Sequence, residues 1–204
     1  LRQSQAYLSG VVELQDASSQ AVVDMVPDAG KILDYCAGGG GKALALAPRA
    51  DSVVFAYDID SKRMSDLPAR AARAGVTIRQ LSSKELEKHG PYDIVLCDAP
   101  CSGSGAWRRA PEGKWSLTEE KLSALVNEQG KILDHAKSLL RPGGILVYAT
   151  CSLLTCENED LVASFLARHP GWRLSVQKRF TVSEFGDGFY TAHLTQEQPA
   201  GNST

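Results

Sequence analysis

Short apolar runs alternate along the chain with longer segments in which apolar residues recur at helical spacing. Five runs predict strands, at residues 31–35, 53–57, 76–79, 93–97 and 145–149. Four of these runs are strongly apolar, which is typical of strands buried on both faces of a parallel sheet. Helical patterns cover residues 42–47, 61–74, 118–140 and 157–168. This alternation predicts a doubly wound α/β sheet with helices on both faces.

The pattern changes after Pro170. Residues 172–178 and 188–194 predict two further strands, which we expect to form an antiparallel hairpin at one edge of the sheet. Five βα units followed by such a pair resemble the seven-stranded, mostly parallel, Rossmann-like sheet of S-adenosylmethionine-dependent methyltransferases. The Arg-Pro-Gly-Gly sequence at 141–144 predicts the turn that ends the long helix. Residues 199–204 are expected to be disordered.

Length and composition describe an ordinary globular chain. The 204 residues are enough for one domain with one core, and we expect a single, monomeric catalytic domain over residues 1–204. No apolar run approaches the ~20 residues needed to cross a bilayer, and nothing resembles a signal peptide, so we expect a cytoplasmic protein without a membrane partner. The chain opens at Leu1 rather than at methionine, and we expect it to be a fragment.

The net charge bears on a nucleic-acid partner, and the cysteine spacing bears on zinc sites and disulfides. The formal charge of -2 gives no support for a nucleic-acid partner, so any claim about RNA must rest on the chemistry. The cysteines are an odd set without a CxxC pair, at positions 36, 97, 101, 151 and 156. This disfavours zinc and a disulfide framework and favours reduced thiols. Cys97 lies inside an apolar strand, where we expect it to be buried and inert.

A glycine-rich loop joins the first strand to the first helix of the sheet. It reads Cys36-Ala37-Gly38-Gly39-Gly40-Gly41-Lys42. Ligands of open α/β sheets bind at the carboxyl ends of the strands, and glycines let the backbone approach a ligand closely. Asp58 ends the second strand, at a place where an acid accepts hydrogen bonds from ribose hydroxyls. The loop and Asp58 therefore predict a nucleoside-type cofactor.

The loop alone leaves the identity of the cofactor open. The spacing of Gly38, Gly40 and Ala43 also satisfies the dinucleotide fingerprint, so an NAD-dependent oxidoreductase is one alternative. A P-loop is disfavoured, because Cys36 stands where that motif needs glycine and Ala43 where it needs serine or threonine.

Two cysteine motifs follow neighbouring strands of the predicted sheet. Asp98-Ala99-Pro100-Cys101 ends the fourth strand, and Thr150-Cys151-Ser152 ends the fifth. A thiolate that adds to carbon 6 of cytosine makes carbon 5 nucleophilic enough to take a methyl group from a sulfonium donor. An acid near ring nitrogen 3 stabilises the developing charge, and Asp98 is placed for this task. Enzymes that methylate exocyclic amines usually have an aromatic residue where Cys101 stands.

At these residues the chain resembles the family of RNA 5-methylcytosine methyltransferases that includes the bacterial 16S rRNA enzymes and the nucleolar Nop2/Sun proteins. The similarity covers residues 15–20, 36–42, Asp58, 98–103, 108–111, Lys114, Trp115, 150–152, 157–159 and 187–189. The resemblance implies that Cys151 attacks carbon 6 and that Cys101 assists release of the product. It also implies that the loop from Cys36 to Lys42, Asp58 and Asp98 line an S-adenosylmethionine site.

The same resemblance makes RNA the expected partner, ribosomal RNA first and transfer RNA next. Arg108, Arg109 and Lys114 follow the Cys101 motif and are expected to contact RNA phosphates. A non-catalytic RNA-binding module is the second alternative. Neither this module nor the NAD-dependent oxidoreductase gives Cys101 and Cys151 a role.

The chain departs from the family pattern in three places. The family loop usually reads Cys-Ala-Ala-Pro-Gly-Gly-Lys-Thr, whereas this chain has Gly38, Gly39 and Ala43. We expect cofactor binding to survive, because glycine leaves the backbone free to approach the ligand. The acid that usually follows the third strand is missing, and Ser82 or Ser83 lies there instead, so the adenine contacts are left open. The family's usual N-terminal RNA-binding domain is not part of the sequence.

Overall fold

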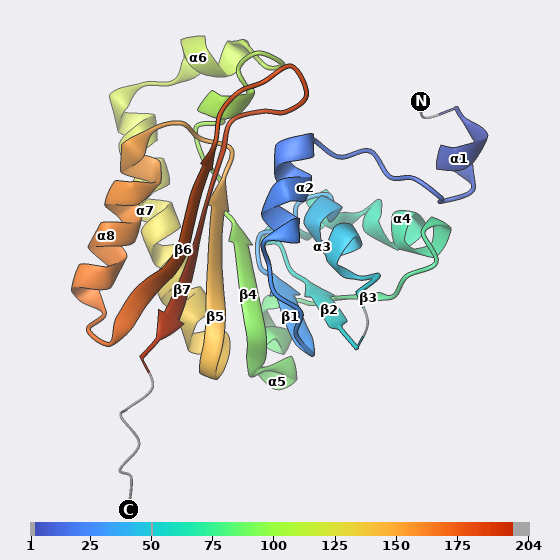
Figure 1. Ribbon diagram of the computed structural model, residues 1–204, viewed down its shortest axis with the longest axis horizontal. Helices are drawn as coiled ribbons and strands as arrows, with labels where there is room; N and C mark the ends of the chain where they lie inside the picture. Colours follow the sequence, from blue (N-terminus) through green and yellow to red (C-terminus); the bar gives the residue numbers. More distant parts are fainter. Residues whose placement is uncertain (1–2, 50, 198–204) are drawn as a thin grey trace, which may run out of the picture.

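A seven-stranded mixed sheet forms the middle layer of the protein (Figure 1). The computed structural model describes residues 3–49 and 51–197. The strands, in chain order, are β1 Lys31–Asp34, β2 Val53–Ala56, β3 Ile78–Gln80, β4 Tyr92–Asp98, β5 Leu140–Thr150, β6 Trp172–Phe180 and β7 Phe189–Gln196. Their order across the sheet is β3-β2-β1-β4-β5-β7-β6.

The pairing confirms the predicted fold class. Strands β1 to β5 pair in parallel, and β7 is antiparallel to both β5 and β6. The predicted hairpin is therefore present, with its second strand beside β5 and its first strand at the edge. This order is that of the Rossmann-like methyltransferase sheet.

Helices cover both faces of the sheet, as the pattern predicts (Figure 1). The α-helices are α1 Gln5–Leu8, α2 Ala17–Asp24, α3 Gly41–Leu46, α4 Leu67–Arg73, α5 Leu86–His89, α6 Glu112–Ser116, α7 Glu119–Ala136 and α8 Glu159–Arg168. Short 3₁₀ segments are η1 Ser61–Met64, η2 Ser83–Glu85, η3 Ser104–Ala106, η4 Lys137–Leu139 and η5 Thr155–Glu157. One apolar core joins the sheet to α2, α3 and α4, and a second joins it to α5, α7 and α8.

Several boundaries differ from the prediction, and three of the differences have local reasons. The helix expected at 61–74 is divided into η1 and α4, and Pro68 lies in the first turn of α4, where its missing N–H costs nothing. The strand expected at 76–79 begins later, because the N–H of Val76 still donates to Ala71 of the preceding helix. The turn expected at 141–144 belongs to the irregular start of β5.

Further predictions concern Cys97, the end of the chain and membrane-spanning helices. Cys97 is fully buried in β4, as expected. The end predicted to be disordered, residues 199–204, lies outside the described residues. Among the helices of the described ranges, none is long and apolar enough to span a membrane.

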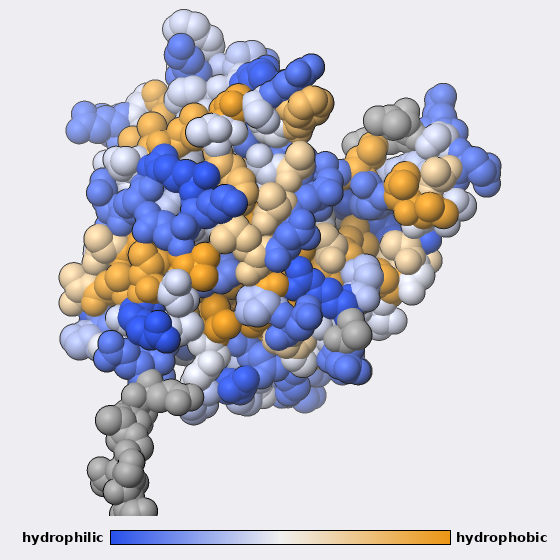
Figure 2. Space-filling model, in the orientation of Figure 1, coloured by the Kyte–Doolittle hydropathy of each residue, from blue (hydrophilic) through white to orange (hydrophobic). Residues whose placement is uncertain are grey.

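The N-terminal segment before α2 runs alongside the α4 side of the molecule (Figure 1). The carboxylate of Glu13 lies 2.6 Å from a guanidinium nitrogen of Arg73 and 3.5 Å from one of Arg70. Leu8 and Val11 of this segment are exposed, and apolar residues are visible around it on the face shown in Figure 2. Asp16 then caps α2, since its Oδ1 accepts from the N–H groups of Ser18 and Ser19.

Candidate active site

A cavity of about 600 Å³ opens at the carboxyl ends of β1, β2, β4 and β5. The predicted site residues that line it are Cys36, Ala37, Gly38, Gly39, Gly41, Lys42, Asp58, Asp98, Cys101 and Cys151. Gly40 does not line the cavity, and Arg108, Arg109 and Lys114 lie outside it. The topology therefore brings the glycine loop and both thiols together around one space, as expected from strand ends that share an edge.

Two residues of α7 line the cavity, whereas the serines that stand in place of the missing acid do not. Neither Ser82 nor Ser83 lines the cavity, whereas Glu128 and Ile132 of α7 do. The sequence could not indicate these two residues, because only the packing of α7 against the sheet brings them to the strand ends.

Two positions in the glycine loop need glycine for its conformation. Gly38 has φ 52° and Gly40 has φ 77°, both in the left-handed region that other residues rarely adopt. A Cβ atom on Gly40 would also lie 2.4 Å from a methyl carbon of Leu67. Gly40 therefore shapes the loop and the start of α3 without facing the cavity.

Asp58 is buried, and its carboxylate already has several partners. Oδ2 accepts from the N–H of Gly38 at 2.8 Å and lies 3.2 Å from the guanidinium of Arg63. Oδ1 accepts from the N–H of Asp60 at 3.0 Å. Sequence reasoning missed Arg63, which also lines the cavity. A ribose bound here would compete with Arg63 for the carboxylate.

Asp34, the last residue of β1, is a cavity residue that sequence reasoning missed. Its Oδ2 accepts from the N–H of Ala43 at 3.0 Å, and its Oδ1 has no hydrogen-bond partner within the described part of the chain. Burial raises the pKa of Asp34 to about 7, and the negative charge of Asp98 adds to this, whereas Lys42 opposes it. A polar residue at the end of an apolar strand, directly before the glycine loop, was the available signal.

These features fit S-adenosylmethionine, whose methionine part carries an ammonium group and whose sulfonium is cationic. An orphan carboxylate oxygen of Asp34 in the cavity offers an acceptor to a cationic donor. The left-handed glycines keep side chains away from the loop backbone, so a nucleoside ligand can approach it. The donor set of the cavity thus suits the expected cofactor.

The two thiols lie in contact. Sγ of Cys101 and Sγ of Cys151 are 3.5 Å apart, and the N–H of Gly105 donates to the carbonyl of Cys151 at 2.9 Å. The hydrogen bond with Cys101 lowers the pKa of Cys151 and so do Lys42 and a backbone N–H, although burial and the charge of Asp98 oppose them. The same hydrogen bond, together with burial, raises the pKa of Cys101. This asymmetry favours a thiolate on Cys151 and a thiol on Cys101.

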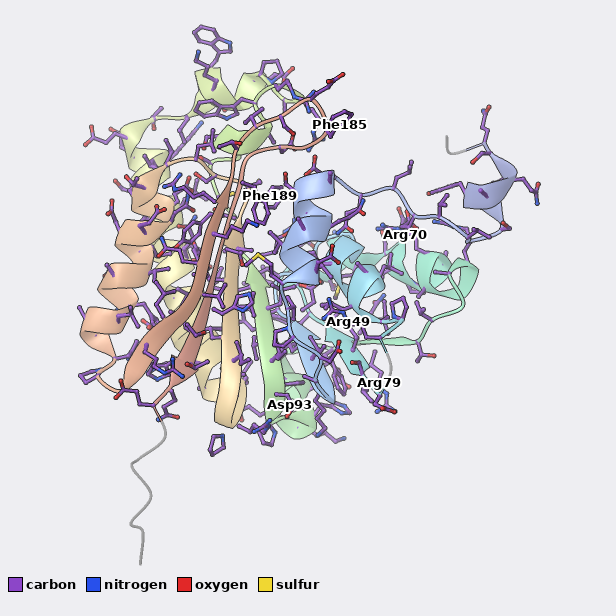
Figure 3. The ribbon with its side chains drawn as sticks, viewed as in Figure 1. Arg49, Arg70, Arg79, Asp93, Phe185 and Phe189 are labelled. Atoms are coloured by element: carbon purple, nitrogen blue, oxygen red, sulfur yellow. The ribbon has the colours of Figure 1, made fainter. Side chains whose placement is uncertain are left out.

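Lys42 ties the glycine loop to the thiol side of the cavity. Its Nζ lies 2.5 Å from Oδ2 of Asp98 and 5.1 Å from the ring centre of Phe189, which points inward beside α2 (Figure 3). Cys36 differs from Cys151 and is like Cys101 in having a raised pKa; burial and the carboxylate of Asp34 hold the pKa of Cys36 well above the ordinary value. Cys36 therefore stays neutral.

The predicted RNA-contacting residues lie on an exposed loop and on α6. Both Nε of Arg109 and its terminal nitrogen donate to the fully buried carboxylate of Asp187, and a terminal nitrogen of Arg108 lies 3.8 Å from the same carboxylate. Lys114 is exposed beside the ring of Trp115. Arg109 thus has a structural partner that the sequence did not indicate, and its positive charge is partly neutralised.

No metal centre is evident in the described ranges, which contain no cluster of three or more His, Cys, Asp or Glu side chains able to hold an ion. The five cysteines are free.

The fold and the cavity define a Rossmann-like, S-adenosylmethionine-dependent methyltransferase. The profile described as 16S rRNA methyltransferase RsmB/F matches residues 22–199, and the chain belongs to this family. The membership confirms the family resemblance and the expected cofactor, and it excludes the NAD-dependent alternative.

Relatives and solved structures agree with this assignment. Ribosomal RNA small subunit methyltransferase B of Salmonella newport is 39% identical over 209 residues, which cover 94% of this chain and 48% of the relative. The crystal structure of NSun6 from Pyrococcus horikoshii with SFG has a TM-score of 0.83 at 25% identity, covering 98% of this chain and 56% of that one. A methyltransferase homolog from Pyrococcus horikoshii has a TM-score of 0.78 at 27% identity, covering 96% and 72%. The chain spans about half the length of the curated relatives it matches.

The raised pKa of Asp34 predicts a specific pH dependence of stability. The carboxyl ionises near pH 3.8 in the unfolded chain but at about 7 in the fold, so its contribution to stability is lost as the pH rises through this interval. Asp34→Asn keeps an oxygen for the N–H of Ala43 and cannot ionise. We expect the free energy of unfolding of Asp34→Asn, measured by chemical denaturation, to increase relative to that of the wild type between about pH 4 and about pH 7.

The exposed Asp66→Asn serves as the control, because Asp66 makes no side-chain cap hydrogen bond in α4. A difference between Asp34→Asn and the wild type that stays constant with pH would contradict the assignment.

Proposed function

We propose that this chain transfers a methyl group from S-adenosylmethionine to carbon 5 of a cytosine in RNA, through a covalent bond between Cys151 and carbon 6. The observation that carries the proposal is the contact of two thiols in one cavity, with Sγ atoms 3.5 Å apart beside a glycine loop. Ribosomal RNA is the favoured substrate, because the relative from Salmonella newport is a ribosomal RNA small subunit methyltransferase. The cytoplasm, where ribosomes are made in bacteria, is the corresponding location.

The first step uses Cys151 as nucleophile. Its thiolate adds to carbon 6 of the base, and the electron pair of the ring double bond moves toward carbon 5 and ring nitrogen 3. The carboxyl of Asp98 gives a proton to ring nitrogen 3, where the negative charge develops, and the carboxylate that remains is stabilised by the ammonium of Lys42. S-adenosylmethionine, when bound against the glycine loop, supplies the methyl group that carbon 5 takes.

The second step releases the product. The proton on carbon 5 passes to solvent water in the cavity, and the electron pair of the broken C–H bond restores the double bond to carbon 6 and expels Cys151 as a thiolate. Cys101 assists this expulsion, because its S–H can donate to the departing sulfur from 3.5 Å away. The lowered pKa of Cys151 suits a sulfur that must both attack and leave.

Two other functions would use the same fold. The same chemistry on transfer RNA needs only a different RNA surface outside the cavity. A non-catalytic RNA-binding module would leave the opposite pKa shifts of Cys101 and Cys151 without a purpose. Bisulfite sequencing of total RNA from a strain lacking the gene identifies the modified cytosine and separates these possibilities.

Exposed cations outside the cavity are proposed to hold the RNA. Arg108 and Lys114 are exposed, and the side chain of Arg109 is 59% exposed while it pairs with Asp187. The double variant Arg108→Gln, Lys114→Gln should bind RNA more weakly. Its binding constant should also fall less steeply with salt, by about one released counterion for each RNA phosphate that no longer has a cationic partner. Binding titrations at several salt concentrations measure this slope.

Lys131→Gln, a neutralisation on the exposed part of α7, is the control for these variants. A salt slope equal to that of the wild type after both substitutions would contradict the proposed RNA contacts.

The roles of the two thiols predict opposite behaviour of their alanine variants. Cys151→Ala removes the nucleophile, so neither methyl transfer nor a covalent RNA adduct should form. Cys101→Ala leaves attack intact but slows release, so a protein–RNA adduct should accumulate as a shifted band on a denaturing gel. An adduct with Cys151→Ala and none with Cys101→Ala would reverse the two roles.

A further inference from the structure

Glu157 is a fully buried carboxylate at the end of η5, next to the two thiol loops. Its Oε1 accepts from the N–H of Ser102 at 2.8 Å and from the amide of Gln129 at 3.0 Å. Its Oε2 accepts from the hydroxyls of Ser102 and Ser152, each at 2.5 Å. Within residues 3–49 and 51–197 it forms no ion pair, so four neutral donors stabilise its charge.

These donors come from both thiol-bearing loops. Ser102 directly follows Cys101, and Ser152 directly follows Cys151. The same amide of Gln129 also donates to the carbonyl of Pro100 at 2.8 Å, so α7 is tied to the Cys101 loop as well. One carboxylate therefore joins two segments that lie about 50 residues apart in the chain.

The charge of Glu157 also acts differently on the two sulfurs. It raises the pKa of Cys101, after the larger effects of the Cys151 hydrogen bond and burial. The leading causes for Cys151 are instead the hydrogen bond with Cys101, which lowers its pKa, and burial, which raises it; Asp98 raises this pKa further and Lys42 lowers it. The titratable and charged groups around the pair are Lys42, Asp98, Cys101, Arg109, Tyr148, Cys151 and Glu157.

We propose that Glu157 is a positioning residue for the two thiols: its carboxylate, which accepts hydrogen bonds from both loops, holds Cys101 and Cys151 in contact and places a negative charge beside Cys101. This inference rests on the proposed function, in which Cys101 must carry a proton to assist the departure of Cys151. A second thiolate beside the first would repel it and could not donate a hydrogen bond.

An uncharged side chain of the same shape separates the charge from the tether. In Glu157→Gln the carboxamide oxygen can still accept from Ser102 N–H and Gln129, and its nitrogen can donate to the two hydroxyls, since serine both donates and accepts. This variant should therefore keep the loops joined and remove only the charge. Glu157→Ala removes both.

The charge is tested by alkylation of Cys101 with iodoacetamide, followed by peptide-resolved mass spectrometry. The rates are measured against pH in a Cys151→Ser background, so that Cys101 reacts alone. In Glu157→Gln the curve of Cys101 alkylation rate against pH should move to lower pH. At a pH below the midpoint of this curve, each unit by which the pKa of Cys101 falls should raise the rate roughly tenfold. Asp160→Asn, an exposed carboxylate in the first turn of α8, should leave the profile unchanged.

The tether is tested by bridging Cys101 to Cys151 with dibromobimane, a reagent that joins thiols in contact. Glu157→Gln should retain the bridging yield of the wild type, and Glu157→Ala should lose most of it, with circular dichroism used to check folding. If Glu157→Ala does not fold, the comparison of Glu157→Gln with Asp160→Asn still decides on the charge.

Two results would overturn the inference: a Cys101 profile that is the same in Glu157→Gln and the wild type, or undiminished bridging in a folded Glu157→Ala. Neither experiment contains RNA or S-adenosylmethionine. A protein that fails to methylate RNA but shows the expected thiol behaviour would therefore refute the proposed function and leave the role of Glu157 intact.

Discussion

The parallel pairing of β4 with β5 is the constraint on which the active site depends. Asp98 lies opposite Ala149 in this register, so both strands end at the same edge of the sheet. The loops that follow bring Cys101 and Cys151 into contact, although 50 residues separate them. Since the central residues of both strands are fully buried, a slip in this register would expose the core and separate the thiols.

The distribution of charge around the cavity gives each group a different task. Two buried carboxyl groups, Asp34 and Asp58, lie at the strand ends on the cofactor side, where burial raises the pKa of Asp34 to about 7 and Arg63 pairs with Asp58. On the thiol side, Lys42 favours the thiolate of Cys151, whereas Glu157 opposes ionisation of Cys101. The two thiols thus differ in acidity, chiefly through the hydrogen bond between them and further through their surroundings, and the proposed attack and release both use that difference.

The sequence predicted the sheet, its edge hairpin and the gathering of the glycine loop with both thiols, because these follow from apolar periodicity and from the rule for strand ends. It could not predict the partner of Arg109, since only folding brings Asp187 to that loop. Glu128 and Ile132 were missed for the same reason, as α7 reaches the cavity through packing. Glu157 lay within a noted motif, but its bonds to Ser102 and Ser152 are tertiary contacts without a spacing signature.

The most direct test of the account is to find which sulfur binds the base. The protein is incubated with S-adenosylmethionine and substrate RNA containing 5-fluorocytosine, whose fluorine cannot leave as a proton does, and the trapped complex is digested for mass spectrometry. The account predicts one nucleotide attached to the peptide that contains Cys151, with the Cys101 peptide unmodified. Attachment to Cys101, or methylation of the natural RNA without any trapped complex, would contradict it.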